Sequence, residues 1–534
     1  MTERRRKFYA WGFEDQSATP EEIRTVESTW AEQFGIDDFD VMPPPKIEDV
    51  ELRAPRITNI PSSLAGLCRT DVYERALHSY GRSFLDGARM FKGDFSSPPD
   101  VVAYPKSEAD VVALLDWCDE IGAAVIPFGG GSSVVGGVNP EIKGDYAGVV
   151  TMDLWYLNDI LELDRESRAA RIQSGIYGPD LERKLKAEGL TLRHYPQSFE
   201  MSTLGGWIAT RAAGHFATGL TYIDDYVESI RMMTPAGPWE SRRLPASGAG
   251  PSPDRMLMGS EGSMGVITEA WVRVLERPKH KVSTTLTFPD FYAGTEAVRA
   301  ISQSGLNPTN CRLVDALEAK LTKSYAGGLP ILVLGFESPR YPVDRQLELA
   351  LELCKDHGGE ILDQAQGSGD NTTVAGLWRN AFIRGPYYRE HMVARGICRE
   401  TFETAVPWSR FRNLHETVTD AVYRAIERVT GRPGTVTCRF THIYPDGPAP
   451  YFTLHCLPDR NRMFEQCMEI KIAAADAVEE CGGTVTHHHA VGRLHMPWYE
   501  KQRPDLFGSA LAAARGTVDP KRIMNPGVIT PEGW

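Results

Sequence analysis

The sequence predicts an α+β protein with two small α+β halves that form one domain, followed by a second α+β domain, which we call the cap. The chain has 534 residues, which is too many for a single hydrophobic core. Strand-like and helix-like patterns alternate up to about residue 277, and a glycine-rich loop follows one of the strands. From Val282 to Phe288 the pattern changes to an alternating strand, followed by a helix from about Ala293 and a strand over Ile331 to Phe336.

Composition is that of an ordinary water-soluble enzyme. Hydrophobic residues make up 42% and charged residues 24% of the chain, and no apolar run is long enough to cross a bilayer. The net charge of -13 argues against nucleic-acid binding. The nine cysteines are scattered and lack CxxC pairs, which favours a reducing compartment. Because Arg4 to Lys7 is not followed by an apolar segment, no secretory signal is predicted, and we expect a cytoplasmic protein.

The first 95 residues are polar and interrupted by prolines. Pro43-Pro44-Pro45 should be extended and should separate two helical patches. We expect residues 1–95 to form a helical and extended N-terminal arm. The domain proper is then predicted at 96–277, the cap at 278–460, and a C-terminal segment at 461–534 that packs back on the first domain.

The first domain opens with a strand over Val101 to Tyr104. Ser107 is a predicted helix N-cap with Asp110 three residues later, and apolar residues follow at helical spacing until Gly122. Ala123 to Phe128 is then the next buried strand, and the sequence Gly-Gly-Gly-Ser-Ser follows its end. Ligands commonly bind at this end of strands in α/β sheets.

Three segments of this domain have the composition of loops that hold a phosphate-containing ligand. Glycines without a Cβ let the backbone approach a pyrophosphate and present successive N–H groups to it. The first loop is not followed by the helix, the third glycine and the acidic residue of a Rossmann fingerprint, so NAD is the poorer prediction. We therefore predict bound FAD between the two halves of the domain, next to the segments 127–133, 202–207 and 259–265.

Longer motifs carry a resemblance to a known family. They are Pro127 to Ser133, Gln197 to Thr203, Leu204 to Ala212, Glu261 to Ile267, Phe402 to Trp408 and Thr486 to Gly492. Through them the chain resembles the vanillyl-alcohol-oxidase or PCMH-type FAD flavoproteins, and within that group the alkyldihydroxyacetonephosphate synthases of ether-lipid synthesis. The segments around Gly206-Trp207-Ile208 and His487-His488-His489 are the ones that favour the synthases.

The resemblance implies a PCMH-type, two-subdomain FAD-binding domain and assigns its cofactor contacts. Members of the wider group often bind FAD covalently through a histidine beside the glycine loop, where this chain has Ser132 and Ser133. We therefore expect non-covalent FAD. The contacts implied are Pro127, Phe128, Gly129, Gly130, Gly131, Ser132, Ser133, Gln197, Ser198, Phe199, Glu200, Met201, Ser202, Thr203, Gly205, Gly206, Ala209, Thr210, Arg211, Ala212, Glu261, Gly262, Ser263, Met264, Gly265, Val266 and Ile267.

The reaction that the resemblance implies is a transferase reaction without net oxidation. The acyl chain of acyl-dihydroxyacetone phosphate is exchanged for a long-chain fatty alcohol through an adduct at flavin N5. Such chemistry needs an acid/base group, cations for the phosphate, and polar groups near the departing carboxylate and the attacking alcohol. The family also suggests a homodimer, and a lipid substrate suggests peripheral contact with a membrane.

Tyr451 matches the tyrosine that serves as the acid/base in the family. On an alternating strand Tyr451, Thr453 and His455 would share one face, so an ordinary core tyrosine is the competing interpretation.

Two arginines match substrate-binding positions. Arg389 suits phosphate oxygens, and an ion pair with a neighbouring Glu is its alternative. Arg312 also matches a family arginine, although an internal bridge to Asp315 would explain it equally well.

His487, His488 and His489 match the histidine triplet of the family, where imidazoles assist the alcohol or bind the leaving carboxylate. A solvated histidine-rich loop is the alternative. On an extended segment only His487 and His489 would face one side, and no Asp, Glu or Cys stands at ligand spacing nearby, so we predict no metal site.

Three positions depart from the family pattern: Ala490 replaces a glycine, Gln197 replaces an aspartate, and His442 is an additional imidazole. The alternative function is an FAD-linked 2-hydroxyacid dehydrogenase or oxidase of the D-lactate or glycolate type. Those enzymes resemble one another in a His-x-Gly-Asp-Gly-Asn-x-His run, and here the matching stretch from His442 lacks the Asn. A flavin-binding protein without catalysis is a third hypothesis, which the presence of Arg389, Tyr451 and the histidines disfavours.

Overall fold

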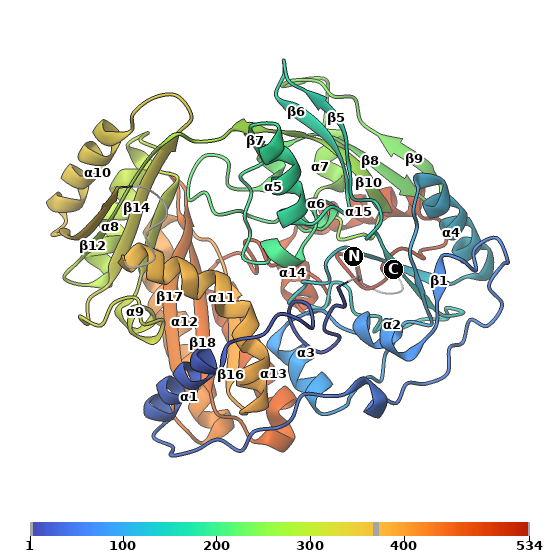
Figure 1. Ribbon diagram of the computed structural model, residues 1–534, viewed down its shortest axis with the longest axis horizontal. Coiled ribbons are helices and arrows are strands. Elements are labelled where there is room, and N and C mark those ends of the chain that lie inside the picture. The colour runs from blue at the N-terminus through green and yellow to red at the C-terminus, as the bar shows by residue number, and fades with distance from the viewer. Residues whose placement is uncertain (1–3, 367–372, 532–534) are drawn as a thin grey trace.

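The computed structural model describes residues 4–366 and 373–531 and contains three larger sheets (Figure 1). The four-stranded sheet has the order β1 (Cys68–Arg69), β2 (Val101–Ala103), β4 (Val149–Asp153) and β3 (Ala124–Phe128), and its last three strands are parallel. The five-stranded antiparallel sheet has the order β5 (Ile160–Asp164), β6 (Ala169–Gln173), β10 (Val266–Arg273), β8 (Val227–Thr234) and β9 (Gly237–Glu240). A two-stranded pair joins β11 (Leu275–Glu276) to β7 (Leu190–Thr191).

The third large sheet lies on the left in Figure 1 and follows these elements in the chain. It is antiparallel, with the order β15 (Glu360–Gln366), β12 (His280–Thr287), β14 (Ile331–Ser338), β13 (Asn310–Val314), β17 (Thr435–Ile443), β18 (Pro448–Cys456) and β16 (Cys398–Glu403). The fold is thus mixed α+β, with two small sheets in the first half and one large sheet in the cap.

Helices cover the sheets and connect them. The helices of the first half are α1 (Pro20–Phe34), α2 (Val72–Leu77), α3 (Phe84–Phe91), α4 (Glu108–Ile121), α5 (Gly178–Ala187), α6 (Leu204–Thr210) and α7 (Pro253–Leu257). Those of the second half are α8 (Phe291–Gln303), α9 (Ala316–Leu321), α10 (Asp344–Asp356), α11 (Val374–Ala394), α12 (Trp408–Thr430), α13 (Met463–Glu480), α14 (Met496–Gln502) and α15 (Asp505–Val518). No helix among the described residues is both long and apolar enough to span a membrane.

Local sequence rules account for the element that leads to the glycine loop. The Ser107 side chain accepts from Asp110 N–H and the Asp110 carboxylate accepts in return, which confirms the predicted capping box. α4 ends at Gly122, whose φ of +68° lies in the left-handed region that glycine tolerates. β3 then follows as predicted. In the cap, α8 begins two residues earlier than expected, because Asp290 caps it by accepting two backbone N–H groups.

The cap sheet has one apolar face and one polar face. Phe402, Phe440 and Phe452 belong to the large core that the sheet forms with helices such as α12 and α13. The alternate residues point to the opposite face, and Glu403, Tyr451 and Arg439 lie opposite one another on three neighbouring strands. The predicted alternation over Tyr451, Thr453 and His455 is therefore confirmed. α11 lies over this polar face (Figure 1).

The C-terminal residues return to the first domain. Met524 forms a bridge with Val125 of β3, and the Asn525 side-chain amide donates to the carbonyl oxygens of Gly137 and Glu261. These bonds join the end of the chain to residues on either side of the glycine loop and to Glu261, which is in a segment predicted to contact the cofactor.

Candidate active site

The glycine-rich loop after β3 packs against the second predicted cofactor segment without room for side chains. A Cβ on Gly130 would lie 1.9 Å from the Met201 carbonyl oxygen, and one on Gly129 would lie 2.3 Å from Thr203 Oγ1. Gly131 has φ +68°, which side chains rarely permit. The result is a cradle of backbone atoms free of Cβ groups, which fits the close approach of a dinucleotide pyrophosphate.

The remaining predicted cofactor segments join this cradle. A Cβ on Gly262 would lie 2.9 Å from the Pro127 ring, and Glu261 N–H donates to the Ala209 carbonyl at 2.8 Å. The Glu261 carboxylate accepts from Val491 N–H at 2.8 Å, and burial raises its pKa to about 7. The fold therefore brings together the four segments that the resemblance assigns to the cofactor and joins them to the loop that carries the histidine triplet. These segments are 127–133, 197–203, 204–212 and 261–267.

Gln197 and Glu200 lie at the border with the cap. The Gln197 amide donates to the Phe382 carbonyl at 3.1 Å, and the Tyr387 hydroxyl donates to the Glu200 carboxylate at 2.5 Å. Both partners are on α11. Gln197, one of the residues that depart from the family pattern, thus connects the first domain to α11, the helix that covers the polar face of the cap sheet.

Tyr451 lies on that polar face and is 4% exposed. The Arg439 guanidinium carbon is 4.0 Å from the centroid of the Tyr451 ring, and the His488 ring stacks on Tyr451 at 5.9 Å. Arg439 is itself held by a buried ion pair of 2.7 Å with Glu318 of α9. Tyr451 thus stands between a fixed cation and an imidazole, which is an arrangement suited to proton transfer.

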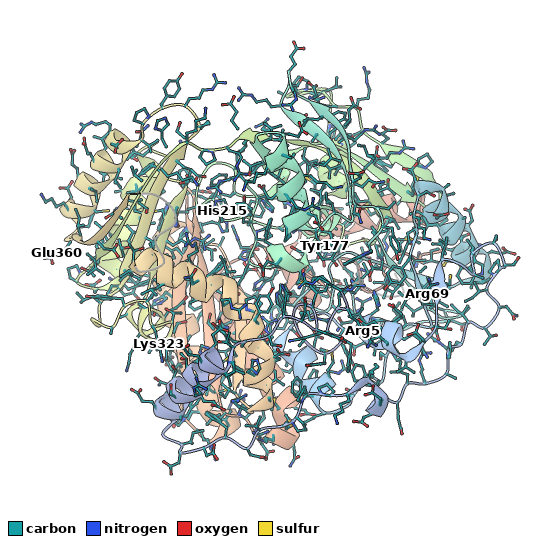
Figure 2. The ribbon with its side chains drawn as sticks, viewed as in Figure 1. Arg5, Arg69, Tyr177, His215, Lys323 and Glu360 are labelled. Atoms are coloured by element: carbon teal, nitrogen blue, oxygen red, sulfur yellow. The ribbon has the colours of Figure 1, made fainter. Side chains whose placement is uncertain are left out.

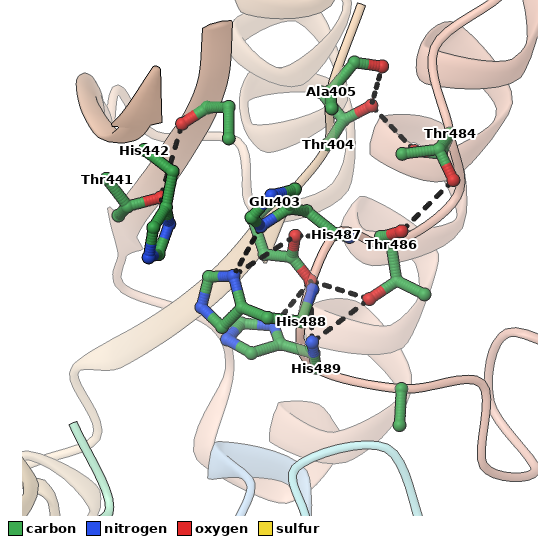
Figure 3. Close-up of polar contacts among 12 residues, drawn as sticks. Glu403, Thr404, Ala405, Thr441, His442, Thr484, Thr486, His487, His488 and His489 are labelled. Atoms are coloured by element: carbon green, nitrogen blue, oxygen red, sulfur yellow. Dashed lines mark hydrogen bonds and ion pairs between the residues drawn. The ribbon is translucent and has the colours of Figure 1, made fainter. Parts of the chain in front are cut away.

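The histidine triplet wraps around a buried carboxylate (Figure 3). Glu403 accepts hydrogen bonds from the backbone N–H groups of His487, His488 and His489 and from the Thr486 hydroxyl. Burial would raise the pKa of Glu403, but the positive charge that the three imidazoles carry once they are protonated at low pH, together with the Thr486 hydrogen bond, holds this pKa well below its usual range. Glu403 therefore remains ionised and fixes the loop.

The imidazoles of the triplet are neutral at physiological pH. Burial lowers the pKa of His487 to about 3 and that of His489 well below its usual value, and it also lowers the pKa of His488. The backbone bends at His487, His488 and His489 instead of running extended, so the expected alternation of His487 and His489 on one side was wrong. His487 Nδ1 instead lies 3.0 Å from His488 Nδ1, because the backbone curves around Glu403.

Arg312 is buried on β13 and lines a cavity of about 540 Å³. It donates to the His215 carbonyl at 3.1 Å and lies beside the rings of Trp378 and Phe382. Asp315 does not hold it: that carboxylate caps α9 and accepts from Cys438 N–H. Figure 2 shows His215 where the cap meets the first domain. Although burial lowers the pKa of Arg312 to about 10, the guanidinium remains charged at neutral pH.

Arg389 lies on α11 at the wall of a small cavity that Trp11 and Arg82 also line. Its neighbour Glu390 forms an ion pair with Lys7 at 2.7 Å. The alternative, an ion pair between Arg389 and Glu390, is therefore not present in the described residues.

Another large cavity, of about 400 Å³, lies over the polar face of the cap sheet, on the opposite side of α11 from the cavity of about 540 Å³. Its lining includes Arg399, Arg439, Thr453 and His455 from the sheet and Tyr388 from α11. Phe382 of α11 approaches both Arg312 and Arg439, with guanidinium carbons 5.2 Å and 5.9 Å from its ring centroid. α11 thus separates two cavities, and its Phe382 lies beside the arginines of both.

The N-terminal segment contributes to the site in a way that the sequence analysis missed. Arg6 is buried and forms an ion pair of 2.6 Å with Asp153, at the end of β4 beside the glycine loop. His78 Nε2 lies 2.9 Å from the same carboxylate. Together with the pair between Lys7 and Glu390, this segment links the cofactor domain to α11. The run of basic residues from Arg4 to Lys7, followed directly by the aromatic residues Phe8, Tyr9 and Trp11, was the signal that could have indicated it.

Glu403 and Arg439 were also not predicted as site residues. Glu403 lies in the motif Phe402 to Trp408 that carried the resemblance, but a carboxylate in a strand has no local feature that shows what it binds. Arg439 reaches the site only through strand pairing between β17 and β18.

Comparison with known proteins agrees with this geometry. Residues 99–241 match the model of an FAD binding domain, and residues 277–529 match the C-terminal domain of FAD linked oxidases. The chain is therefore an FAD-linked enzyme of the PCMH-type family.

Within that family, it is similar to the alkyldihydroxyacetonephosphate synthase of Dictyostelium discoideum, with 29% identity over 489 residues, 87% of this chain and 78% of that one. A solved structure of an alkyldihydroxyacetonephosphate synthase superposes with a TM-score of 0.81 at 25% identity, covering 97% of this chain and 98% of that one. The chain is also 26% identical to glycolate oxidase subunit GlcD of Bacillus subtilis over 452 residues, 81% of this chain and 89% of that one. The predicted family, the α+β fold and the FAD cofactor are confirmed.

Proposed function

We propose that this enzyme exchanges the acyl group of acyl-dihydroxyacetone phosphate for a long-chain fatty alcohol and so makes an ether-lipid precursor and a fatty acid. The observation that carries this proposal is Tyr451, held between the Arg439 guanidinium and the His488 imidazole on the buried polar face. The similarity to alkyldihydroxyacetonephosphate synthases supports the choice of substrates. When bound, FAD, which we expect to be non-covalent, supplies the reactive ring nitrogen for the exchange.

Tyr451 takes and returns the proton on C1 of the substrate. Arg439, 4.0 Å from the ring, places a positive charge beside the negative charge that develops on the phenol during that transfer. Because the Glu318 ion pair fixes Arg439, the cation is in position before the reaction starts.

Of the two predicted arginines, Arg312 is the one that we assign to the phosphate, because Arg389 lines a different, small cavity. A guanidinium offers a planar pair of donors to phosphate oxygens, and Arg312 presents its charge to the cavity of about 540 Å³. The same cavity is lined by Phe336, Trp378 and Phe382, which suit the apolar part of the substrate.

The histidine triplet serves the alcohol. Since the imidazoles are neutral, His488 can accept the hydroxyl proton as the alcohol attacks, and the charge on Glu403 stabilises the resulting imidazolium. Lipid substrates also imply peripheral contact with a membrane from the cytoplasmic side, and we expect a homodimer. Flotation with liposomes tests the first and light scattering tests the second.

The test is an anaerobic exchange assay. The purified yellow protein is mixed with acyl-dihydroxyacetone phosphate and a labelled long-chain alcohol, and labelled ether is measured without an electron acceptor. Ether formation with only transient flavin bleaching supports the proposal. Tyr451→Phe should retain FAD and lose at least about 100-fold in turnover, because it removes the acid/base group. Tyr341→Phe, at a residue that is 71% exposed, is the matched control.

Oxidation of a 2-hydroxy acid is the second candidate. The similarity to a glycolate oxidase subunit and the additional imidazole of His442 beside the triplet favour it. In that case simple 2-hydroxy acids would bleach the flavin lastingly and no ether would form.

A further inference from the structure

A cavity of about 290 Å³ in the first domain is separate from the two large cavities of the cap. It lies at the carboxyl ends of two parallel strands, because Tyr104 follows β2, and Trp155 and Tyr156 follow β4. The glycine loop stands at the same end of the third parallel strand, β3. Ligands of α/β sheets commonly bind at this end of the strands, and the exchange reaction proposed above does not use this cavity.

The lining of the cavity is rich in cations. Five of its residues are basic and one is acidic, and the basic residues are Arg4, Arg5, Arg6, Arg69 and Lys106. Figure 2 shows Arg5 and Arg69 in the same region of the first domain. The acidic residue, Glu74, accepts a hydrogen bond from the Tyr104 hydroxyl at 2.6 Å. The cavity therefore presents more positive than negative charge to a ligand.

Three of the five cations have carboxylate partners that lie outside the lining. The ion pairs measure 2.8 Å, 3.7 Å and 2.6 Å, and they are Arg4 with Asp15, Arg5 with Glu14, and Arg6 with Asp153. These pairs hold the N-terminal segment in place beside the cavity, so this part of the wall is formed before a ligand binds.

Arg69 and Lys106 form no ion pair among the residues that the structure describes. Arg69 donates to the backbone carbonyls of Gly66 and Cys68, and both side chains are exposed at the edge of the cavity. A phosphate monoester carries a charge of roughly -1.5 to -2 near neutral pH and offers three acceptor oxygens. One such group can therefore pair with both cations.

Aromatic rings form much of the remaining wall, and they are Tyr73, Tyr104, Trp155 and Tyr156. The Arg5 guanidinium already covers the Tyr73 ring, with its carbon 3.9 Å from the ring centroid. Tyr156, in contrast, is 41% exposed, and Lys106 Nζ lies 5.7 Å from its ring centroid. An exposed ring beside an unpaired cation suits a ligand that combines a planar base with a phosphate.

We propose that this cavity binds a nucleoside monophosphate at a site distinct from that of FAD. Arg69 and Lys106 pair with the phosphate, and the Tyr156 ring stacks on the base. A volume of about 290 Å³ is near the lower end of the range for small-molecule pockets, roughly 300 Å³, which favours a mononucleotide over a dinucleotide. None of the residues that the resemblance assigns to FAD lines the cavity. The inference does not depend on which reaction the enzyme performs.

The test uses the flavin-loaded protein, so that FAD occupies its own site. Binding of AMP is measured by isothermal titration calorimetry, and adenosine and inorganic phosphate are titrated under the same conditions. Wild type should bind one AMP per chain. Adenosine and phosphate should each bind at least about 10-fold more weakly, because each lacks one half of the contacts.

Two substitutions separate the two halves of the site. Lys106→Met removes a charge that pairs with the phosphate and should weaken AMP binding by at least about 10-fold. Tyr156→Leu removes the stacking ring and should weaken it by at least about 5-fold. Both side chains are exposed, so the variants should fold, and flavin absorbance with the melting temperature checks this. Lys186→Met is the matched control, since it removes an exposed lysine charge of the same domain outside the cavity, and it should bind AMP like wild type.

Four outcomes would overturn the proposal. They are no binding of AMP to wild type, binding of inorganic phosphate as tight as that of AMP, AMP binding in Lys106→Met as tight as in Lys186→Met, and release of flavin by AMP, which would show competition for the cofactor site. None of these readouts uses turnover, so failure of the exchange assay leaves this test intact.

Discussion

Replacing Glu403 by Gln tests whether this carboxylate holds the histidine loop in place. In the structure one carboxylate oxygen accepts from the Thr486 hydroxyl and from His488 and His489 N–H, while the other accepts from His487 N–H. The amide keeps one acceptor oxygen and turns an N–H₂ group toward a backbone donor. At least one charge-assisted bond is lost, which costs about 1.5–3 kcal/mol, and a buried donor is left unsatisfied, which adds about 1–3 kcal/mol.

We take about 3 kcal/mol as the loss of local stability. This loss raises the equilibrium constant for opening of the loop, and with it the exchange rate of its amides, roughly 100-fold. Hydrogen–deuterium exchange of a peptide spanning residues 484–495 measures it directly. Glu400→Gln is the matched control, because Glu400 is equally buried on the same strand, faces the other side and pairs with Lys471 at 3.2 Å. Unchanged exchange in Glu403→Gln, or an equal effect in Glu400→Gln, would refute the reasoning.

The pH dependence of this protection has a definite sign. The folded-state pKa of Glu403 is depressed, so its contribution is fully present above the unfolded value of about 4.3 and is lost only as pH falls through the lower folded value. Glu403 alone would keep the protection of the loop constant from about pH 5 upward. The folded-state pKa values of the three imidazoles are also depressed, so they bind protons when the loop opens, and protection, corrected for the intrinsic pH dependence of exchange, should fall as pH drops below about 6.5.

Three further outcomes follow from the same contacts. Gly130→Ala should abolish FAD retention, measured by flavin absorbance after gel filtration, because its Cβ would lie 1.9 Å from the Met201 carbonyl oxygen. Lys7→Met should lower stability by about 1–3 kcal/mol in urea unfolding, less than the usual cost of breaking a buried pair because burial already raises the pKa of Glu390 and lets it take up a proton. Glu261 has a pKa of about 7 in the folded state against 4.5 when exposed, so it binds a proton more readily in the folded protein. Its contribution to stability therefore falls by at most about 3 kcal/mol as pH rises from about 4.5 to 7. Glu261→Gln should flatten this part of the profile of melting temperature against pH.

Matched substitutions separate these effects from general damage. Gly66→Ala places its Cβ in open space and should retain FAD. Arg5→Met removes a largely exposed charge and should change stability by less than about 1 kcal/mol. FAD retained in Gly130→Ala, Lys7→Met as stable as Arg5→Met, or an unchanged pH profile in Glu261→Gln would each contradict the corresponding expectation.

Local patterns in the sequence were enough to predict the fold class, the cofactor and the elements around the glycine loop. The Ser107 capping box, the left-handed Gly122 and the strand that ends at Phe128 depend on residues a few positions apart, so short-range rules describe them. The shared face of Tyr451, Thr453 and His455 likewise follows from the period of a strand.

Only the tertiary structure determines which partners the side chains of the site have. The bulge in β17 that turns His442 toward His487, the carboxylate of Glu403 inside the triplet loop, and the ion pair between Lys7 and Glu390 each join segments separated by tens to hundreds of residues. The physical reason is that strand register, loop curvature and the pairing of buried charges minimise the free energy of the whole assembled molecule, and no local window of the sequence contains both partners.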